Sequence, residues 1–447
     1  MKIRRKQTLI IALVGLILLQ SCAAFPRFND KRPNFLIVLT DDQRIGSMDF
    51  MPVTKSIIFD QGVTFDHGYD TTPLCCPSRA SILTGMYDHN NGVRTDDDRL
   101  KLPTFVDALH QNGYYTGLVG KYLNSWDGDP RPEFSSWVSF FRGESKYYDP
   151  YLDVNGTWAY HDGYITDILS DYAIQFLDSA AKQPRPFLLY FAPNAPHLPS
   201  TPKIEDKHLL DQLPPFRPPS YNQADVSKMP PWFQSQLMGP NGIKFVDNSR
   251  RNMLLDLIDV DRNMAKILTT MKNNGQLDNT VIIYLSDNGW FWGEHRLTMK
   301  DSYYEEGARI PFAMRYPPLI PKPYVEERMV GNIDIAPTIY QLAGIPIPKN
   351  VDGLSWVNLF NGGPWRDSLL IEGWPPRGAY DAIHTERYVY AETKSEGQPT
   401  FPEFYDLQLD PYELNNAVND PAYQSIIASL KQQLPLLEKQ SGAPTTP

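Results

Sequence analysis

The residues with the clearest potential for chemistry form one short segment, CCPSRASILTG, from Cys75 to Gly85. Pro77 suits the first turn of a helix, and Gly85 suits the position that ends one. A nucleophile at a helix start faces free backbone N–H groups, which favour a negative charge there. Arg79, about one turn further on, could hold a tetrahedral oxyanion through charge-assisted hydrogen bonds. The segment therefore predicts a nucleophile in an oxyanion-binding site.

The cysteine count makes the pair at the start of this segment unusual. The chain has only three cysteines, Cys22, Cys75 and Cys76. Adjacent cysteines rarely form a disulfide with each other, because the bond geometry would be strained. One of the two could therefore serve in chemistry, while the other could be no more than a small buried residue.

Four short apolar runs have the pattern of buried parallel strands, and a polar group follows each of them. These groups are Asp41 with Asp42, Lys121, His197, and Asp287 with Asn288. Any one of them alone would be ordinary loop chemistry. In an open α/β sheet, however, ligands bind beyond the carboxyl ends of the strands. The four polar strand ends together predict a single site.

The elements that must position these groups alternate between strand and helix, which is typical of an α/β sheet with helices on both faces. We expect a large, mixed, mostly parallel sheet in a catalytic domain over residues 30–352. A long amphipathic helix is predicted over 249–275, and the Pro-rich residues 200–248 predict an ordered insertion over the site. Residues 353–447 predict a smaller C-terminal α+β subdomain, in which 382–393 alternates as one antiparallel strand before a terminal helix.

The first residues have the features of an export signal. A basic cluster at residues 2–6 precedes a short apolar run, 8–19, that is too short to span a membrane comfortably. The residues before Cys22 resemble a bacterial lipobox, so residues 1–22 predict a lipoprotein signal peptide, with Cys22 lipidated and the protein attached to a membrane. Gln20 departs from that motif, which leaves open simple signal cleavage or a retained anchor helix. All three alternatives predict export to a bacterial periplasm or cell envelope.

The overall charge limits the classes of partner. The net charge is −10, from 52 acidic and 42 basic residues, whereas a nucleic-acid-binding protein is usually basic. We therefore expect no nucleic-acid partner. An anionic substrate is compatible with this charge, because the local charge in a cleft governs binding.

The segment from Cys75 to Gly85 resembles the signature of the sulfatase family, C-x-P-S-R-x-x-x-L-T-G, at every fixed position. The register makes Cys75 the residue that this family oxidises to formylglycine, whose hydrated aldehyde attacks sulfur. The resemblance implies an alkaline-phosphatase/sulfatase-like fold. It also implies a maturing partner, either a formylglycine-generating enzyme or an anaerobic sulfatase-maturing enzyme. Cys76 is then expected to be a small packing residue.

Two further segments, RPNFLIVLTDDQ and LSDNGWFWGEHRLTMKDSYYEEGARIPF, are similar to those that carry the metal ligands of the family. The resemblance implies a divalent cation that is bound by Asp41, Asp42, Asp287 and Asn288, with the modified Cys75 as a further ligand. Carboxylate and amide oxygens suit Ca2+, with Mg2+ the lesser alternative. Zinc would normally recruit His or Cys. The structural alternative is that these Asp and Asn residues only form turns.

The resemblance also implies roles for four cationic or titratable residues. Arg79, Lys121 and Lys300 would neutralise the charge that develops on the sulfate group. His197 would act as general acid and protonate the leaving oxygen. The alternatives are solvated lysines and a structural histidine in a Pro-rich loop.

One departure from the family lies in GKYLN, residues 120–124. Many members have Gly-Lys-Trp-His here, and that histidine helps to release the sulfate from the enzyme. Leu123 occupies its place and cannot act as a base. GKYLN together with CCPSR resembles the branch of N-acetylglucosamine-6-sulfatases and extracellular heparan 6-O-endosulfatases. This implies a sulfated carbohydrate substrate, such as a 6-O-sulfated N-acetylglucosamine unit, with His295 and Asn124 as substrate contacts.

Two other functions remain open from the sequence. A phosphomonoester or phosphodiester hydrolase of the same superfamily would use a similar site, because sulfate and phosphate esters are near isosteres. A catalytically silent lipoprotein that binds sulfated glycans would require Cys75 to remain a thiol.

Overall fold

The computed structural model describes residues 32–443, apart from residues 127, 232 and 377. The predicted signal peptide and the predicted lipidation site, Cys22, lie outside the described residues. Among the helices of the described part, none has the length and apolar character needed to cross a membrane.

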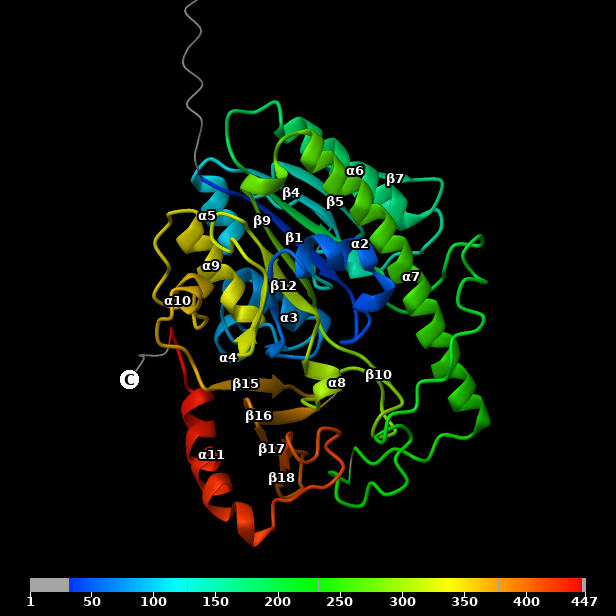
Figure 1. The fold of residues 1–447 in the computed structure, drawn as a ribbon, viewed down its shortest axis with the longest axis vertical. Helices are drawn as coiled ribbons and strands as arrows, with labels where there is room; N and C mark the ends of the chain where they lie inside the picture. The colour runs from blue at the N-terminus through cyan, green and yellow to red at the C-terminus, as the bar shows by residue number, and fades with distance from the viewer. Residues whose placement is uncertain (1–31, 127, 232, 377, 444–447) are drawn as a thin grey trace, which may run out of the picture.

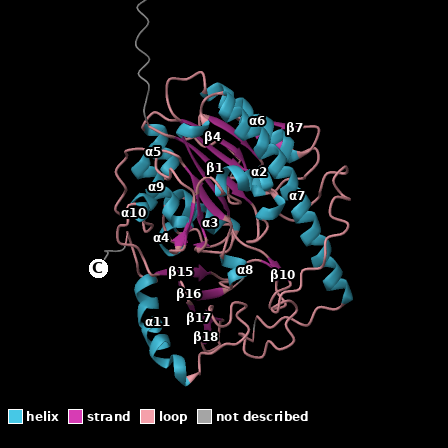
Figure 2. Cartoon of the chain, viewed as in Figure 1, coloured by secondary structure: helices cyan, strands magenta, loops and turns pink. Residues whose placement is uncertain are grey.

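A ten-stranded sheet forms the centre of the fold (Figures 1 and 2). Its four middle strands are parallel to one another and almost wholly buried, as expected for apolar strands that are covered on both faces. They are, in spatial order, β9 (Thr280–Ser286), β1 (Asn34–Thr40), β8 (Phe187–Ala192) and β4 (Tyr115–Gly120).

The remaining strands extend this sheet on both sides in mixed orientation. Beyond β9 lie β12 (Phe312–Arg315), β2 (Val63–Phe65) and β13 (Tyr324–Glu326). Beyond β4 lie β5 (Ser136–Ser139), β6 (Tyr151–Val154) and β7 (Thr157–Tyr160). Strand β5 is parallel to β4, whereas β12 is antiparallel to β9. The predicted large, mixed, mostly parallel sheet is confirmed.

Helices cover both faces of the sheet, and the side chains of β1 alternate between the two resulting cores. Phe35 and Ile37 belong to one core, and Leu36 and Val38 belong to the other. The first core also contains residues from α3 (Cys75–Thr84), α5 (Phe105–Gln111), α9 (Ile335–Leu342) and α10 (Trp356–Phe360). The helices on the second core are α6 (Ile165–Ala180) and α7 (Pro240–Asn273), with the short α2 (Pro52–Thr54) beside them (Figure 1).

Shorter elements connect these layers. The short helices are α4 (Asp88–Asn91) and α8 (Glu305–Ala308). Two small ladders pair β3 (Gly68–Tyr69) with β14 (Val330–Gly331), and β10 (Phe291–Trp292) with β11 (Thr298–Met299).

The C-terminal residues form a separate four-stranded antiparallel sheet, with α11 (Gln424–Leu437) packed against it (Figure 1). Its strands are β15 (Ser368–Gly373), β16 (Ala379–Thr385), β17 (Tyr388–Lys394) and β18 (Phe401–Asp406). The prediction of one strand over 382–393 is wrong, because this segment is a hairpin of β16 and β17. The tight turn at residues 386 and 387 is polar but contains no glycine or proline, so the sequence alternation did not reveal it.

The long helix is confirmed, but it begins earlier than predicted. Helix α7 starts at Pro240, a residue suited to the first helical position. The irregular insertion therefore ends at residue 239. It is ordered against the segment that follows β10, since Asn222 N donates to Gly293 O at 2.7 Å and His295 N donates to Ser220 O at 2.8 Å.

A buried histidine connects the C-terminal sheet to the larger unit. His384 on β16 is fully buried, and its Nε2 donates to Tyr303 O at 3.0 Å. Burial lowers the pKa of His384 to about 3, from an ordinary value of 6.5. The neutral, buried His384 therefore contributes its full stability above pH 6.5. This contribution is lost as the pH falls toward 3, because the unfolded chain takes up a proton at this histidine at a higher pH than the folded protein does.

We therefore expect His384→Gln to flatten the acid dependence of stability. Between pH 4 and 6, the change in unfolding free energy per pH unit should be smaller by about 1.4 kcal/mol. This difference corresponds to about one proton less taken up on unfolding. Urea unfolding at several pH values measures this slope. Equal slopes for His384→Gln and the unmodified protein would contradict the assignment.

Candidate active site

Cys75 is the first residue of α3, a helix that is buried along its whole length. The helix ends at Gly85, which has a left-handed φ of +72°. A Cβ at this glycine would lie 2.9 Å from Val351 Cγ1, so both conformation and space favour glycine there. The predicted arrangement, with the cysteine at a helix start and Gly85 at its end, is confirmed.

The four polar strand ends meet, as the sequence predicts. Asp41 and Asp42 directly follow β1, Lys121 directly follows β4, and Asp287 directly follows β9. These strands and β8, which leads to His197, are the four parallel neighbours at the centre of the sheet. Their carboxyl ends therefore open onto one place.

The thiol of Cys75 lies inside this cluster. Its Sγ is 2.7 Å from Lys300 Nζ and 3.5 Å from Asp41 Oδ1. Ligand atoms of Asp41, Asp42, Cys75 and His197 all lie within 4.8 Å of one another. Segments separated by more than 200 residues in sequence thus converge on one sulfur atom.

Three buried cations pair with the carboxylates of this cluster. Arg79 Nε lies 2.8 Å from Asp287 Oδ2, and Lys121 Nζ lies 2.7 Å from Asp41 Oδ2. Lys300 Nζ donates to both Asp42 Oδ1 and the thiol of the cysteine. These cations are aimed at the reacting position, which is the geometry needed to stabilise an anionic group there.

The acidic residues form a set of donors that fits a hard divalent cation. Asp42 Oδ2 and Asn288 Oδ1 are buried and accept no hydrogen bond from any described residue. The amide of Asn288 donates to Asp42 Oδ1 at 2.8 Å, which leaves its oxygen free to coordinate. Burial alone would raise the pKa of Asp41, but nearby cationic groups, led by Lys121, outweigh it and lower the pKa to about 2. The cluster therefore offers an ionised carboxylate at Asp41 and two buried oxygens that accept no hydrogen bond from a described residue, a set of donors that fits a hard divalent cation.

His197 also belongs to the cluster and faces its open side. Its Nε2 lies 3.6 Å from Asp42 Oδ2, and its side chain is 26% exposed. His197 thus lies beside the thiol and has a titratable side chain that reaches solvent. A substrate that enters from this side would meet the imidazole first.

Two predictions of substrate contact have different outcomes. The structure does not bring His295 to the cluster: its ring is fully buried, stacks on Tyr304 and lies 3.5 Å from Glu306. A substrate contact at His295 is therefore not supported. Asn124 lies near the cluster, and its buried Oδ1 has no hydrogen-bond donor among the described residues, so its contact with substrate stays a prediction.

The neighbours of the motif residues have packing roles. Cys76 is buried in the first core, with its Sγ 3.7 Å from Ser125 Oγ, which confirms that it is a packing residue. Leu123 is also part of this core and is 3% exposed. Its side chain therefore packs in this core and offers no group for proton transfer.

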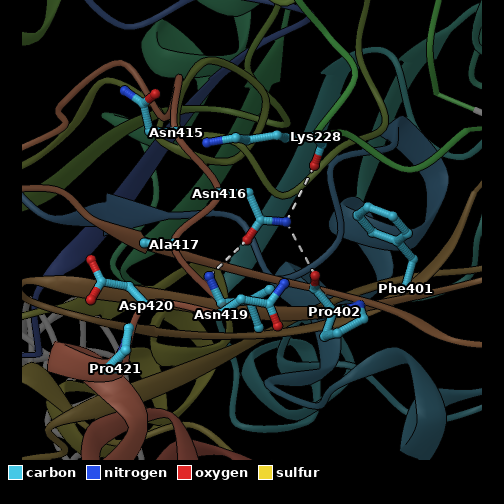
Figure 3. Close-up of a pocket in the computed structure, with 10 residues that line it drawn as sticks. Lys228, Phe401, Pro402, Asn415, Asn416, Ala417, Asn419, Asp420 and Pro421 are labelled. Carbon is cyan, nitrogen blue, oxygen red and sulfur yellow. Dashed lines mark hydrogen bonds between the residues drawn. The ribbon is translucent and has the colours of Figure 1, made fainter.

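A separate cavity of about 660 Å³ lies at the C-terminal sheet (Figure 3). Asn416 is committed to the local structure there, since its amide donates to the carbonyls of Lys228 and Pro402. None of the residues around the Cys75 thiol lines this cavity. It is therefore not the site of the chemistry.

Comparison with known families matches nearly the whole described chain. The sulfatase family model covers residues 33–345, and the model for the C-terminal part of N-sulphoglucosamine sulphohydrolase covers residues 293–440. Two models with overlapping ends thus account for both the large sheet and the C-terminal sheet.

Individual relatives agree with this match. The chain is 34% identical over 385 residues to the extracellular sulfatase SULF-1 homolog of Drosophila melanogaster, covering 80% of this chain and 34% of that protein. It is 30% identical over 481 residues to human N-acetylglucosamine-6-sulfatase, covering 92% and 85%. A solved structure in complex with its substrate D-glucosamine-2-N,6-O-disulfate aligns with a TM-score of 0.82 at 26% identity, covering 91% of this chain and 98% of that chain.

The fold, the signature helix and these matches define the class: the chain belongs to the sulfatase family. Within this family it lies near the N-acetylglucosamine-6-sulfatase branch. The chain spans only about a third to a half of the length of the SULF-1 homologs that it matches in Drosophila melanogaster and Caenorhabditis elegans.

Proposed function

We propose that this protein hydrolyses sulfate esters on a sulfated glycan, with a formylglycine made from Cys75 as the nucleophile. The observation that carries this proposal is the position of Cys75. Its Sγ lies at a helix start, in contact with Lys300 and within 4.8 Å of the carboxylates that follow β1. Membership of the sulfatase family indicates the reaction, sulfate ester hydrolysis, for which this arrangement is suited.

The environment of the thiol favours a modified residue over a free cysteine. Burial raises the pKa of Cys75 well above its ordinary value, although Lys121 and Lys300 act against this shift. An unmodified thiol would therefore remain protonated and would be a poor nucleophile at neutral pH. Oxidation by a formylglycine-generating enzyme or an anaerobic sulfatase-maturing enzyme would instead supply a hydrated aldehyde, whose hydroxyl can attack sulfur.

The residues around this position divide the remaining tasks. Lys121, Lys300 and Arg79 hold positive charge next to the nucleophile, where negative charge develops on the sulfate oxygens. His197, on the open side, donates a proton to the oxygen of the leaving alcohol. Overall, one water molecule is consumed, and the products are the free alcohol and sulfate.

A divalent cation, Ca2+ before Mg2+, completes the proposed site. Asp41, Asp42, Asp287 and Asn288 would hold it, as their oxygens are the ligands that a hard cation prefers. When bound, the ion supplies Lewis-acid polarisation of the sulfate oxygens.

The proposed substrate is a 6-O-sulfated glucosamine unit of a glycan. Two similar proteins support it: one is named N-acetylglucosamine-6-sulfatase, and another is described in complex with D-glucosamine-2-N,6-O-disulfate. We further propose that the protein is exported to a bacterial cell envelope, with residues 1–22 as the signal and Cys22 as the lipidation site.

Steady-state kinetics on matched esters test the reaction class. We expect kcat/KM for an aryl sulfate to exceed that for the corresponding aryl phosphate by at least about 100-fold, because the site then stabilises the sulfuryl transition state by about 2.7 kcal/mol more. N-acetylglucosamine-6-sulfate should be desulfated, with free sulfate measured by ion chromatography. A preference for the phosphate ester would instead assign a phosphoester hydrolase.

A further inference from the structure

A second cavity, of about 510 Å³, adjoins the reaction site. One wall is the loop that connects β5 to β6, residues 143–147, and the other is the segment from Asn194 to Pro199, which includes His197. The group proposed to protonate the leaving oxygen is thus part of the cavity wall. Its volume is within the range of pockets that bind small ligands.

The loop is fastened to the reaction site at both ends. Tyr147 Oη donates to His197 O at 2.9 Å, and His197 N donates to Asn194 O at 2.9 Å. At the other end, Gly143 has a left-handed φ of +67°, and a Cβ there would lie 2.9 Å from Lys121 Cε and 3.0 Å from Asn124 Oδ1. The cavity therefore keeps a fixed position relative to the reacting atoms.

The cavity presents polar groups that the fold leaves free. Asn194 is 4% exposed, and its Oδ1 accepts no hydrogen bond from any described residue. Lys146 is exposed, and the structure shows no hydrogen bond or ion pair for its ammonium group among the described residues. Glu144 is also exposed at the rim, where it could accept hydrogen bonds from hydroxyl groups. Leu198 and Pro199 add an apolar surface for the face of a ring.

We propose that this cavity binds the sugar unit that carries the scissile sulfate, and that Lys146 recognises a second anionic substituent on that sugar. This inference rests on the proposed sulfatase function and specifies its substrate as a multiply charged glycan unit. With the leaving oxygen at His197, the sugar ring would lie against Leu198, and Asn194 Oδ1 would accept a hydrogen bond from a hydroxyl or N–H group. The ammonium group of Lys146 would then pair with an N-sulfate or a similar anion.

The test compares two substrates that differ only in the second anion, glucosamine-2-N,6-O-disulfate and N-acetylglucosamine-6-sulfate. We expect Lys146→Ala to lower the ratio of their kcat/KM values about tenfold, the size of one charge-assisted hydrogen bond. Lys146→Arg should keep most of the ratio. Because the pair is exposed, the effect should shrink between 50 and 500 mM salt. Lys182→Ala, at an exposed lysine after α6, is the matched control and should leave the ratio unchanged.

A second variant tests the floor of the cavity. Asn194→Ala should lower kcat/KM for both sugars by tenfold or more relative to kcat/KM for an aryl sulfate, which lacks the sugar hydroxyl groups. The thermal unfolding temperature of the variant should match that of the unmodified protein.

The outcomes separate this inference from the proposed function. If the unmodified protein turns over sulfate esters but Lys146→Ala leaves the substrate ratio unchanged, the assignment of the second anion to Lys146 is overturned. If no sulfate ester is turned over by correctly matured protein, the proposed function itself fails.

Discussion

Replacing Cys75 with alanine should abolish turnover of sulfate esters, with kcat lower by roughly 10⁴-fold or more, as for the loss of other covalent nucleophiles. The reason is that neither Lys300 nor Asp41, the groups that contact the thiol, can take its place as the attacking atom. The fold should survive, because the substitution removes one buried atom and leaves α3 with a good helix former. Circular dichroism and thermal unfolding check this.

The neighbouring cysteine provides a matched control. Cys76 is equally buried but packs in the core beside Ser125. Cys76→Ala should therefore keep kcat within a few-fold and cost about 1 kcal/mol of stability for the lost packing. Similar losses of activity in both variants would mean that Cys75 acts through packing of the helix start and not as the nucleophile.

Mass spectrometry of the peptide over residues 71–85 tests the same prediction without a mutation. Conversion of one cysteine to formylglycine lowers the mass by about 18 Da, because an oxygen replaces the sulfur and two hydrogens are lost. Fragment ions should place the change on Cys75 and leave Cys76 unmodified. Fully active protein in which Cys75 is an intact thiol would overturn the proposed nucleophile.

The sequence predicted the centre of the site because the topology of a parallel sheet limits where its strand ends can lie. Apolar runs identified β1, β4, β8 and β9, and the polar residues that follow such runs must share one edge. The signature segment added the helix start of α3. Neither step required knowledge of side-chain contacts.

The sequence could not predict features that depend on contacts between irregular segments. His295 follows the end of β9 by only nine residues, yet a positive φ of +52° turns its backbone and the ring packs on Tyr304. Asn194 and Lys146 lie in irregular segments, and a hydrogen bond from Tyr147 Oη to the carbonyl of His197 joins these segments. Such neighbours become visible only in the three-dimensional structure.

Removal of the divalent cation should have the second-largest effect. We expect stringent chelation to lower kcat by at least about 100-fold, because the Lewis acid that polarises the sulfate oxygens is lost and the cluster keeps an excess of uncapped oxygens. Added Ca2+ should restore the activity, and Mg2+ should restore less of it, since Mg2+ demands tighter octahedral geometry. Chelation should also lower the thermal unfolding temperature, because the ion binds only the folded state.

The free oxygen of Asn288 allows the metal ligands to be tested one at a time. Asn288→Ala removes the buried Oδ1 that accepts no hydrogen bond and should raise the Ca2+ concentration for half-maximal activity by tenfold or more, whereas Asn288→Asp keeps an oxygen ligand and should shift it less. Asn415→Ala, at an exposed asparagine lining the separate cavity, serves as the control.

Calorimetric titration with Ca2+ gives the same comparison independently of turnover. A binding constant that is unchanged in Asn288→Ala would therefore exclude this side chain as a ligand even if activity fell. The oxygen of Asn288 would then have to be explained by the stability of the turn after β9, and the loss of activity by a displacement of Asp287 and its partner Arg79.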